Sequence, residues 1–387
     1  MKKIYMDYAA TTPAHEKVVE AMKPYFSGMY GNPSSVHSFG QEASEAVEEA
    51  RGKIASLVGA GADEMYFTSG GTESDNWAVI GTACANGRKG KHIVTTPIEH
   101  HAVQDPVRHL GKSGWEISEV RVDRFGMVDP ADLKKALRDD TVLVSVMHAN
   151  NETGTIEPVA ELSKVARSRG ALFHTDAVQT AGAVETDVNS LGVDLLSISG
   201  HKLYGPKGVG ALYVRKGTRI DRYMMGGGQE KGKRASTENV PGIVGFGAAA
   251  ELARAEMKKR TDHLIPLRDK LIKGVLGSID ESFLNGHPVM RLPNNANFSI
   301  KYVEGESMLL NLDLMGVAAS SGSACTSGSL AASHVLLSMG LPHDLAHGSL
   351  RLTLGRLTTE SDIDYVLEIL PGIVKKLRAM SPLYKKP

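Results

Sequence analysis

Residues 197–208 read SISGHKLYGPKG and continue an apolar run that starts at Asp194. The run from 194 to 199 is apolar enough to be a strand that enters a protein interior, yet it delivers the cation Lys202 to its carboxyl end. A buried cation without a partner would be costly in free energy. We therefore expect the Lys202 amine to be neutralised, paired or used covalently.

The composition is that of a globular protein with room for two domains. The chain has 387 residues, and 42% hydrophobic against 23% charged residues excludes a disordered chain. Lys plus Arg and Asp plus Glu both total 44, so no basic excess indicates nucleic acid or anionic lipid. No apolar stretch has the length of a membrane span, and the N-terminus does not read as a secretory leader. Two distant cysteines, Cys84 and Cys325, favour a reducing compartment, and we expect a cytoplasmic protein.

Helical and strand patterns alternate through the first two thirds of the chain. Helical periodicity covers 15–26, 40–60, 71–87 and 101–114, and β-branched apolar runs cover 64–68, 91–97, 141–151, 171–178, 194–199 and 210–216. The strand patterns are apolar almost throughout, which is typical of strands that are covered on both faces. The sequence therefore predicts an α/β fold with a mostly parallel central sheet.

The pattern changes after residue 260. A helical stretch at 261–279 and short strand patterns at 296–300, 316–322 and 349–355 indicate a smaller α+β domain. We predict a large domain over 15–260 and a small domain made of 1–14 plus 261–387. The glycine-rich and basic stretch 225–237 is expected to be a loop.

Polar groups follow five of the predicted strands, and ligands bind at the carboxyl ends of parallel strands. In chain order they are the glycine turn Ser69-Gly70-Gly71-Thr72-Glu73, the pair His100-His101, the pair Asn150-Asn151 with Glu152, Asp176 with Gln179, and Gly200-His201-Lys202. Each group alone has a structural explanation that is more common than a functional one, such as a helix cap. Their coincidence at one sheet edge indicates a single site.

Pyridoxal phosphate is a cofactor that uses all five kinds of group. It needs a lysine for a covalent link, a carboxylate at its pyridine nitrogen, a phosphate site and a group stacked on its ring. Lys202 and Asp176 fit the first two needs, whereas Lys207 lies beyond the strand and is expected at the surface or near the phosphate. The adjacent His100 and His101 lack the spacing of metal ligands, so we predict no metal site.

A second candidate group lies near the C-terminus. Cys325 lies in SSGSACTSGS (320–329), which has almost no apolar anchor, so we expect an exposed, mobile loop with an accessible nucleophilic thiol. Cys84 lies in a helical pattern and is expected to be a small buried side chain. Arg351 lies within a strand pattern and needs an anionic partner, either a substrate carboxylate or a structural carboxylate, and the sequence leaves both open.

The chain resembles the cysteine desulfurases of the nitrogen-fixation and iron–sulfur-cluster type. The resemblance runs through ordered motifs along the whole chain, including YMDYAATTP, FTSGGTESDN, MHANNETGTIEP, FHTDAVQ, SISGHKLYGPKGVGALY, GGGQEKGKRASTEN, SSGSACTSGSL and LRLTLGR. It implies a class-V aminotransferase-like protein with the pyridoxal-phosphate fold of type I, similar to aspartate aminotransferase. It also implies a homodimer with its sites at the subunit interface.

The resemblance implies a role for each site residue. Lys202 would bind the cofactor covalently, His100 would stack on its ring and assist proton transfer, and Cys325 would be the nucleophile. Arg351 and Asn151 would contact the substrate. The remaining cofactor-binding residues would be Gly71, Thr72, Asn151, Asp176, Gln179, Ser199 and His201, with Thr237 from the other subunit.

The implied reaction converts L-cysteine to L-alanine and leaves a persulfide on Cys325. The sulfur would pass to an iron–sulfur scaffold or another acceptor protein, in a nitrogenase-associated or a housekeeping pathway. The alternatives are an aminotransferase or a selenocysteine lyase on the same scaffold, or a non-catalytic sulfur-carrier platform. The length of the segment around Cys325 resembles the branch with an extended loop rather than the selenocysteine-lyase-like branch.

Overall fold

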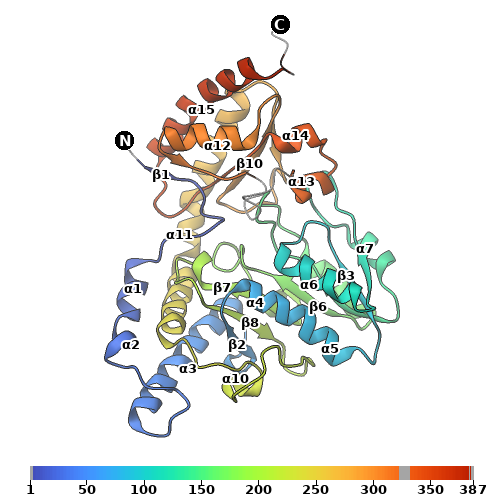
Figure 1. Ribbon diagram of the computed structural model, residues 1–387, viewed down its shortest axis with the longest axis vertical. Coiled ribbons are helices and arrows are strands. Elements are labelled where there is room, and N and C mark those ends of the chain that lie inside the picture. The colour runs from blue at the N-terminus through green and yellow to red at the C-terminus, as the bar shows by residue number, and fades with distance from the viewer. Residues whose placement is uncertain (1–2, 322–331, 383, 385–387) are drawn as a thin grey trace.

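The fold has two parts that are joined by one long helix. A computed structural model describes residues 3–321, 332–382 and 384. In Figure 1 the larger part lies below and contains a central sheet between helices, and the smaller part lies above it. The helix α11 (Val240–Ser278) runs from one part into the other.

The central sheet has seven strands in the order β2-β8-β7-β6-β5-β3-β4. The strands are β2 (Met65–Thr68), β3 (His92–Thr95), β4 (Glu116–Glu119), β5 (Thr141–Ser145), β6 (Leu172–Asp176), β7 (Leu195–Ser199) and β8 (Gly210–Val214). Only β8 runs antiparallel to its neighbours, and the other neighbouring pairs are parallel. The prediction of a mostly parallel sheet in an α/β fold is confirmed.

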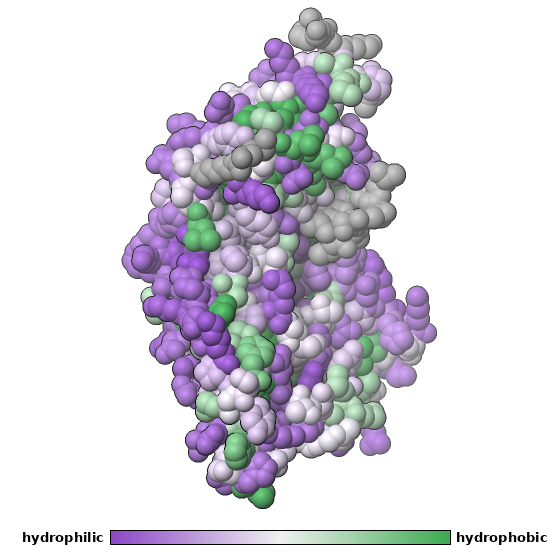
Figure 2. Space-filling model, turned by 60° about the vertical axis from the view of Figure 1, so that its left-hand side comes forward, coloured by the Kyte–Doolittle hydropathy of each residue, from purple (hydrophilic) through white to green (hydrophobic). Residues whose placement is uncertain are grey.

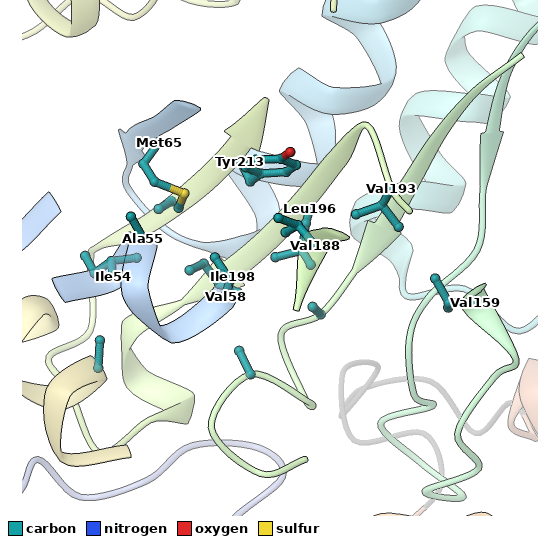
Figure 3. Close-up of a cluster of buried hydrophobic side chains, with 14 of the residues drawn as sticks. Ile54, Ala55, Val58, Met65, Val159, Val188, Val193, Leu196, Ile198 and Tyr213 are labelled. Carbon is teal, nitrogen blue, oxygen red and sulfur yellow. The ribbon is translucent and has the colours of Figure 1, made fainter. Parts of the chain in front are cut away.

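The helices of the larger part pack against this sheet or against the helices beside it. They are α1 (Glu16–Met22), α2 (Pro24–Ser27), α3 (Ser38–Val58), η1 (Ala62–Glu64), α4 (Gly71–Asn76), the π-helical turn η2 (Trp77–Gly81), α5 (Thr82–Asn86), α6 (His101–Lys112), α7 (Pro130–Ala136), α8 (Val159–Ser168), α9 (Val188–Leu191), η3 (Gly200–Lys202) and α10 (Gln229–Gly232). Figure 3 shows one side of the core, where Ile54 and Val58 of α3 lie near Met65 of β2 and Ile198 of β7. Burial of such side chains stabilises a fold by about 1.5–3 kcal/mol each, so this packing fixes the strands whose ends carry the site.

The smaller part has two sheets and its own apolar core. Its elements are β1 (Ile4–Tyr5), β9 (Ser282–Asn285), β10 (Asn295–Ile300), α12 (Gly305–Leu314), β11 (Val317–Ala318), α13 (His334–Ser338), α14 (His343–His347), β12 (Ser349–Thr353) and α15 (Glu360–Met380). Strands β12, β10 and β9 are antiparallel neighbours. The N-terminal strand β1 pairs with β11 in parallel, so the N-terminal arm lies in this part of the molecule.

The predicted boundary at residue 260 falls inside α11 rather than in a linker. The first half of this helix contributes Phe246 and Ala250 to the core beneath the large sheet. Its second half contributes Leu267 and Leu271 to the core of the smaller part. The division into two domains at this residue stays a prediction.

Three expectations from the sequence need correction. Cys84 is exposed on α5 rather than buried, because the buried positions of this helix are taken by Thr82 and Ala83. Strand β5 ends at Ser145, so the predicted strand 141–151 is too long. The predicted loop 225–237 contains the helical turn α10, in which Glu230 and Lys231 have positive φ angles of 48° and 58°.

Candidate active site

The predicted polar groups lie at one edge of the central sheet. Strands β3, β5, β6 and β7 are parallel neighbours in the sheet, and β2 points the same way because the antiparallel β8 separates it from β7. Gly210, the first residue of β8, pairs with both Thr68 at the end of β2 and Ser199 at the end of β7. The turn after β2 and the turn after β7 therefore lie on either side of Gly210, at the same edge of the sheet.

Two glycines shape the turn after β2. Gly70 has a φ angle of 157°, a conformation that L-residues with side chains rarely adopt. A Cβ atom on Gly71 would lie 2.7 Å from Val178 Cγ2, so the helix start could not sit against the segment after β6 if it carried a side chain. Gly71 is also the first residue of α4, where backbone N–H groups are free to bind an anion.

An open pocket of about 350 Å³ lies in front of this turn. It is lined by Thr11, Ser69, Gly70, Gly71, Thr72, Glu73, Ser199, His201, Lys207 and Gly208. Four predicted phosphate-binding residues, Gly71, Thr72, Ser199 and His201, therefore line one cavity. Lys207 is exposed, as one of its two predicted positions requires, and it also lines this pocket.

His201 is held by the N-terminal arm. One of its ring nitrogens, Nδ1, lies 3.1 Å from Thr11 Oγ1, and its carbonyl accepts a hydrogen bond of 2.6 Å from Thr12 Oγ1. Burial lowers the pKa of His201 to about 4, and the neighbouring Lys202 and Lys207 act in the same direction. At neutral pH the ring is therefore uncharged and serves the pocket as a hydrogen-bonding group.

Glu73 joins the turn to a distant segment. Its carboxylate accepts hydrogen bonds of 2.8 and 3.0 Å from Arg234 and one of 2.8 Å from Ser69 N–H. Burial opposes ionisation, but Arg234 and Ser69 hold the pKa of Glu73 below its ordinary value. The segment before Thr237 is thereby fixed to the start of α4.

The same segment is anchored a second time through Glu230. Its carboxylate accepts hydrogen bonds of 2.8 and 2.9 Å from Arg51 on α3, and one of 2.8 Å from Phe67 N–H on β2. These contacts explain why a stretch that reads as a loop adopts a fixed turn with positive φ angles. Thr237 itself is exposed and does not line the pocket of its own chain.

The Lys202 amine is partly buried and points at the N-terminal arm. Nζ donates hydrogen bonds to the carbonyl oxygens of Ala9 and Ala10, the latter at 2.8 Å. Gln179 Nε2 donates to the same Ala9 oxygen at 3.1 Å. Lys202 and Gln179 line a second, smaller pocket between the two parts of the molecule, which also contains Tyr8.

Asp176 ends β6 and is 7% exposed. Its Oδ1 accepts a hydrogen bond of 2.8 Å from Val178 N–H. Burial raises the pKa of Asp176 to about 6, while the charge of Lys202 opposes this rise. In this environment a cationic N–H donor would stabilise the ionised carboxylate of Asp176.

A second buried carboxyl, Asp75 on α4, interacts with the charge of Asp176 and was not predicted. Burial and the charge of Asp176 raise the pKa of Asp75 well above its ordinary value. Its Oδ1 lies 3.6 Å from His174 Nε2, and that ring nitrogen lies 3.0 Å from Ser197 Oγ. When Asp75 holds a proton, Asp176 can remain ionised without a buried like charge beside it.

His100 caps α6 with its ring. Nδ1 accepts a hydrogen bond of 3.1 Å from Ala102 N–H, which places the proton of the neutral ring on Nε2. Burial lowers the pKa of His100 to about 4, and the charge of Lys202 adds to this. The side chain is therefore a neutral imidazole with one N–H donor at neutral pH.

Arg351 lies on β12 and is almost fully buried. Nη1 donates to the carbonyl oxygen of Asn151 at 3.0 Å, and Nη2 donates to Asp7 Oδ1 at 2.9 Å. Of the two partners that the sequence left open, the structure contains a carboxylate of the chain itself. Asn151 contacts Arg351 through its backbone carbonyl oxygen.

Cys325 lies outside the described residues. The chain on either side of that segment is anchored near Arg351. Ser320 pairs with Arg351 through two backbone hydrogen bonds of 2.7 and 3.2 Å. On the other side, Ser333 Oγ donates to the buried carboxyl of Glu152, whose pKa is raised to about 7 by burial.

Sequence reasoning missed several residues that shape the site, among them Asp7, Asp75 and Arg234, and it assigned no partner to Glu73. Glu73 and Arg234 lie 161 positions apart, and no local pattern connects them. Asp7 lies in a motif that was quoted for the resemblance, and its position next to a buried strand arginine is visible only in the fold. Among the described residues, no group of three or more His, Cys, Asp or Glu side chains could hold a metal ion.

No helix in the described part of the chain has the length and apolar character needed to cross a bilayer.

Comparison with known proteins identifies the family. The class-V aminotransferase family matches residues 4–366. The chain is 58% identical over 385 residues to "Cysteine desulfurase IscS" of Dictyoglomus turgidum, covering 100% of this chain and 98% of that protein. This chain belongs to the cysteine desulfurases of the class-V aminotransferase family.

Two solved structures have the same fold. One described as "NIFS-LIKE PROTEIN" matches with a TM-score of 0.91 and 37% identity, over 97% of this chain and all of that chain. Another, "SspA in complex with cysteine", matches with a TM-score of 0.81 and 32% identity, over 92% of this chain and all of that chain. The predicted family and fold are therefore confirmed.

Proposed function

We propose that this protein is a pyridoxal-phosphate-dependent cysteine desulfurase that converts L-cysteine to L-alanine and transfers the sulfur to Cys325. The observation that carries the proposal is the arrangement at the sheet edge. An open pocket of about 350 Å³ at a helix start, a partly buried amine and a buried carboxylate lie at the same sheet edge. The membership in the cysteine desulfurases supports the choice of reaction.

The residues present fit the cofactor. Gly71, whose missing side chain leaves room for a close backbone approach, would hold the phosphate with Thr72, Ser199 and His201. Asp176 would pair with the pyridine nitrogen, because a buried carboxylate is stabilised by a cationic donor. Lys202 would bind the aldehyde covalently. The remaining contacts would come from His100 on the ring, Gln179 at the phenolic oxygen, Asn151, and Thr237 of the other subunit.

When bound, pyridoxal phosphate supplies an electron sink that weakens the bonds at Cα of an amino acid. Lys202, once its amine is free, removes the proton from Cα of the substrate. Its present partners, the Ala9 and Ala10 carbonyls, keep the amine close to the sheet edge. Well-placed acid and base groups contribute about 10²–10⁴-fold to such steps.

The other side chains bind the substrate and carry its sulfur. Arg351 binds the substrate carboxylate, and Asn151 lies beside it. The Cys325 thiolate attacks the substrate sulfur, so an S–S bond forms as the Cβ–S bond breaks. Protonation of Cβ then completes L-alanine, and the neutral His100 has an Nε2–H that can take part in this proton transfer.

We further propose that the protein is a homodimer. Apolar side chains are exposed over α1 to α3, with Phe26 66% exposed, Tyr30 67% and Val36 91%. Figure 2 shows hydrophobic patches over the lower part of this face. An exposed apolar cluster of this kind is a signature of an interface, and Thr237 is exposed as a residue that reaches a partner's site must be.

The sulfur acceptor is proposed to be an iron–sulfur scaffold or another acceptor protein, in a housekeeping or a nitrogenase-associated pathway. This rests on the family and on relatives such as the NifS-like structure. A cytoplasmic location is proposed because a reactive thiol at Cys325 requires a reducing compartment.

Mass spectrometry of the protein after exposure to L-cysteine tests the reaction. We expect one added sulfur atom on Cys325 and one equivalent of L-alanine. Cys325→Ala should abolish both, whereas Cys84→Ala, which removes the other cysteine, should change neither. An active Cys325→Ala variant would favour an aminotransferase, and a protein that binds no pyridoxal phosphate would favour a sulfur-carrier platform.

A further inference from the structure

We propose that Asp7 is a positioning and specificity residue that holds Arg351 until the carboxylate of the substrate replaces it. Arg351 has three groups that can donate, and two of them are engaged. Nη1 donates to the Asn151 carbonyl oxygen at 3.0 Å, and Nη2 donates to Asp7 Oδ1 at 2.9 Å. The buried Nε has no hydrogen-bond partner among the described residues.

The contact between Asp7 and Arg351 is therefore incomplete. A carboxylate can bind a guanidinium through two parallel hydrogen bonds, and this bidentate form is the stronger one. The Asp7 side chain accepts one hydrogen bond, from Nη2, through a single oxygen. The Nε–H of Arg351 has no acceptor among the described residues. A buried donor without an acceptor costs free energy, so Arg351 in this state favours a carboxylate that reaches both Nη2 and Nε.

The two sides of the pair differ in their access to solvent. The Asp7 side chain is 20% exposed, whereas that of Arg351 is 2% exposed. A ligand that approaches from solvent thus meets Asp7 first. The Asp7 backbone is fixed, because its carbonyl accepts a hydrogen bond from Tyr5 and the residue forms a bridge to Thr353. Its side chain can rotate away while the arm stays in place.

Because the substrate carboxylate replaces the Asp7 carboxylate, the guanidinium of Arg351 has a carboxylate partner before and after the exchange. A buried arginine that lost the carboxylate with which it pairs would be strongly destabilised, so Asp7 stabilises the free protein. A ligand without a carboxylate cannot displace Asp7, so the guanidinium of Arg351 then stays bound to Asp7. Asp7 would in this way select ligands that carry a carboxylate, and its role toward L-cysteine rests on the proposed function.

Propionate and its neutral analogue propionamide are suitable probes, because they contain neither amine nor thiol. Titration calorimetry on the purified holoprotein would compare the wild type with Asp7→Asn. The carboxamide keeps the size and the acceptor of Asp7 but removes its charge. We expect Asp7→Asn to bind propionate roughly threefold to tenfold more tightly and propionamide no more tightly. Unchanged or weaker propionate binding, or no saturable binding to the wild type, would overturn the proposal.

A double-mutant comparison separates exchange at Arg351 from a general effect of charge. Arg351→Lys keeps the positive charge but lacks the forked donors. In that background Asp7→Asn should give no gain in propionate affinity, and an equal gain in both backgrounds would contradict the exchange. Should Asp7→Asn fail to fold, Asp7→Ser provides the same comparison.

Glu16→Gln is the matched control, because Glu16 also pairs with a C-terminal arginine, Arg356, but at the surface. It should leave propionate affinity unchanged. Propionate binding needs no turnover, so the two proposals can fail separately. A protein that does not release sulfur from cysteine but shows the tighter binding would refute only the desulfurase function.

Discussion

Glu73 and Arg234 form an ion pair across 161 positions of sequence, with 2.8 Å between Glu73 Oε1 and Arg234 Nε. The two side chains are 8% and 15% exposed. Glu73 also accepts from Ser69 N–H, so the pair joins the pocket in front of the turn after β2 to the segment that precedes Thr237. The first prediction follows from this connection.

Glu73→Ala should weaken pyridoxal-phosphate binding about tenfold or more, because it leaves a partly buried arginine unpaired and frees the turn at Ser69. The dissociation constant, measured by titrating the cofactor-free protein with pyridoxal phosphate, checks this. Glu49→Ala removes an exposed ion pair with Lys53 and should leave the constant unchanged. Equal dissociation constants for the wild type, Glu73→Ala and Glu49→Ala would show that the Glu73–Arg234 pair does not support cofactor binding.

Lys202→Ala should abolish the covalent link to pyridoxal phosphate, because Lys202 is the amine whose charge acts on Asp176 at the sheet edge. Borohydride reduction followed by mass spectrometry should find the cofactor on a peptide that contains residue 202 in the wild type and on no peptide of the variant. Lys207→Ala should keep the link and bind the cofactor less tightly, since Lys207 lines the same pocket. Labelling of Lys207 in the wild type would refute the assignment.

Gly71→Ala should lower the affinity for the cofactor and the melting temperature together. The new Cβ would lie 2.7 Å from Val178 Cγ2, so the turn or the segment after β6 must move. The control is Gly372→Ala on the exposed face of α15, where a Cβ meets no atom within 4 Å. That change should stabilise the protein by roughly 0.5–1 kcal/mol. Thermal unfolding of the holoproteins gives both results.

The buried carboxyl of Glu157 predicts a pH dependence of stability. Its Oε2 accepts from Val128 N–H at 2.9 Å, Oε1 has no hydrogen-bond partner among the described residues, and burial raises the pKa of Glu157 from 4.5 to about 8. A raised pKa in the folded state means that the stabilisation is complete below pH 4.5 and is lost as the pH rises to about 8.

Across that window Glu157 should lower the free energy of unfolding by up to about 1.4 kcal/mol per pH unit. Glu157→Gln cannot ionise, so its melting temperature should fall less than that of the wild type between pH 5 and pH 8. Glu161→Gln, at an exposed position on α8, should follow the wild type. Parallel curves for the wild type and Glu157→Gln would show that Glu157 does not titrate in this range.

The strand ends illustrate what could be predicted. The groups at Gly71, His100, Asp176 and Lys202 were expected at one edge because parallel strands place their carboxyl ends together, and the sheet order confirms that geometry. Cys84 was predicted wrongly, because a helical pattern does not show which face a small residue occupies. The partner of Arg351 stayed open, since Asp7 is 344 positions away.

The class of fold, the family and the chemical groups at the sheet edge could be predicted from the amino-acid sequence, because these depend on local periodicity and on residue type. The pairing of side chains across long distances, such as Glu73 with Arg234 and Asp7 with Arg351, became visible in the folded chain alone. Burial likewise exists only in the fold, and it lowers the pKa of His100 and raises the pKa of Asp176. The physical reason is that both pairing and the loss of water around a side chain depend on segments that pack together from distant parts of the chain.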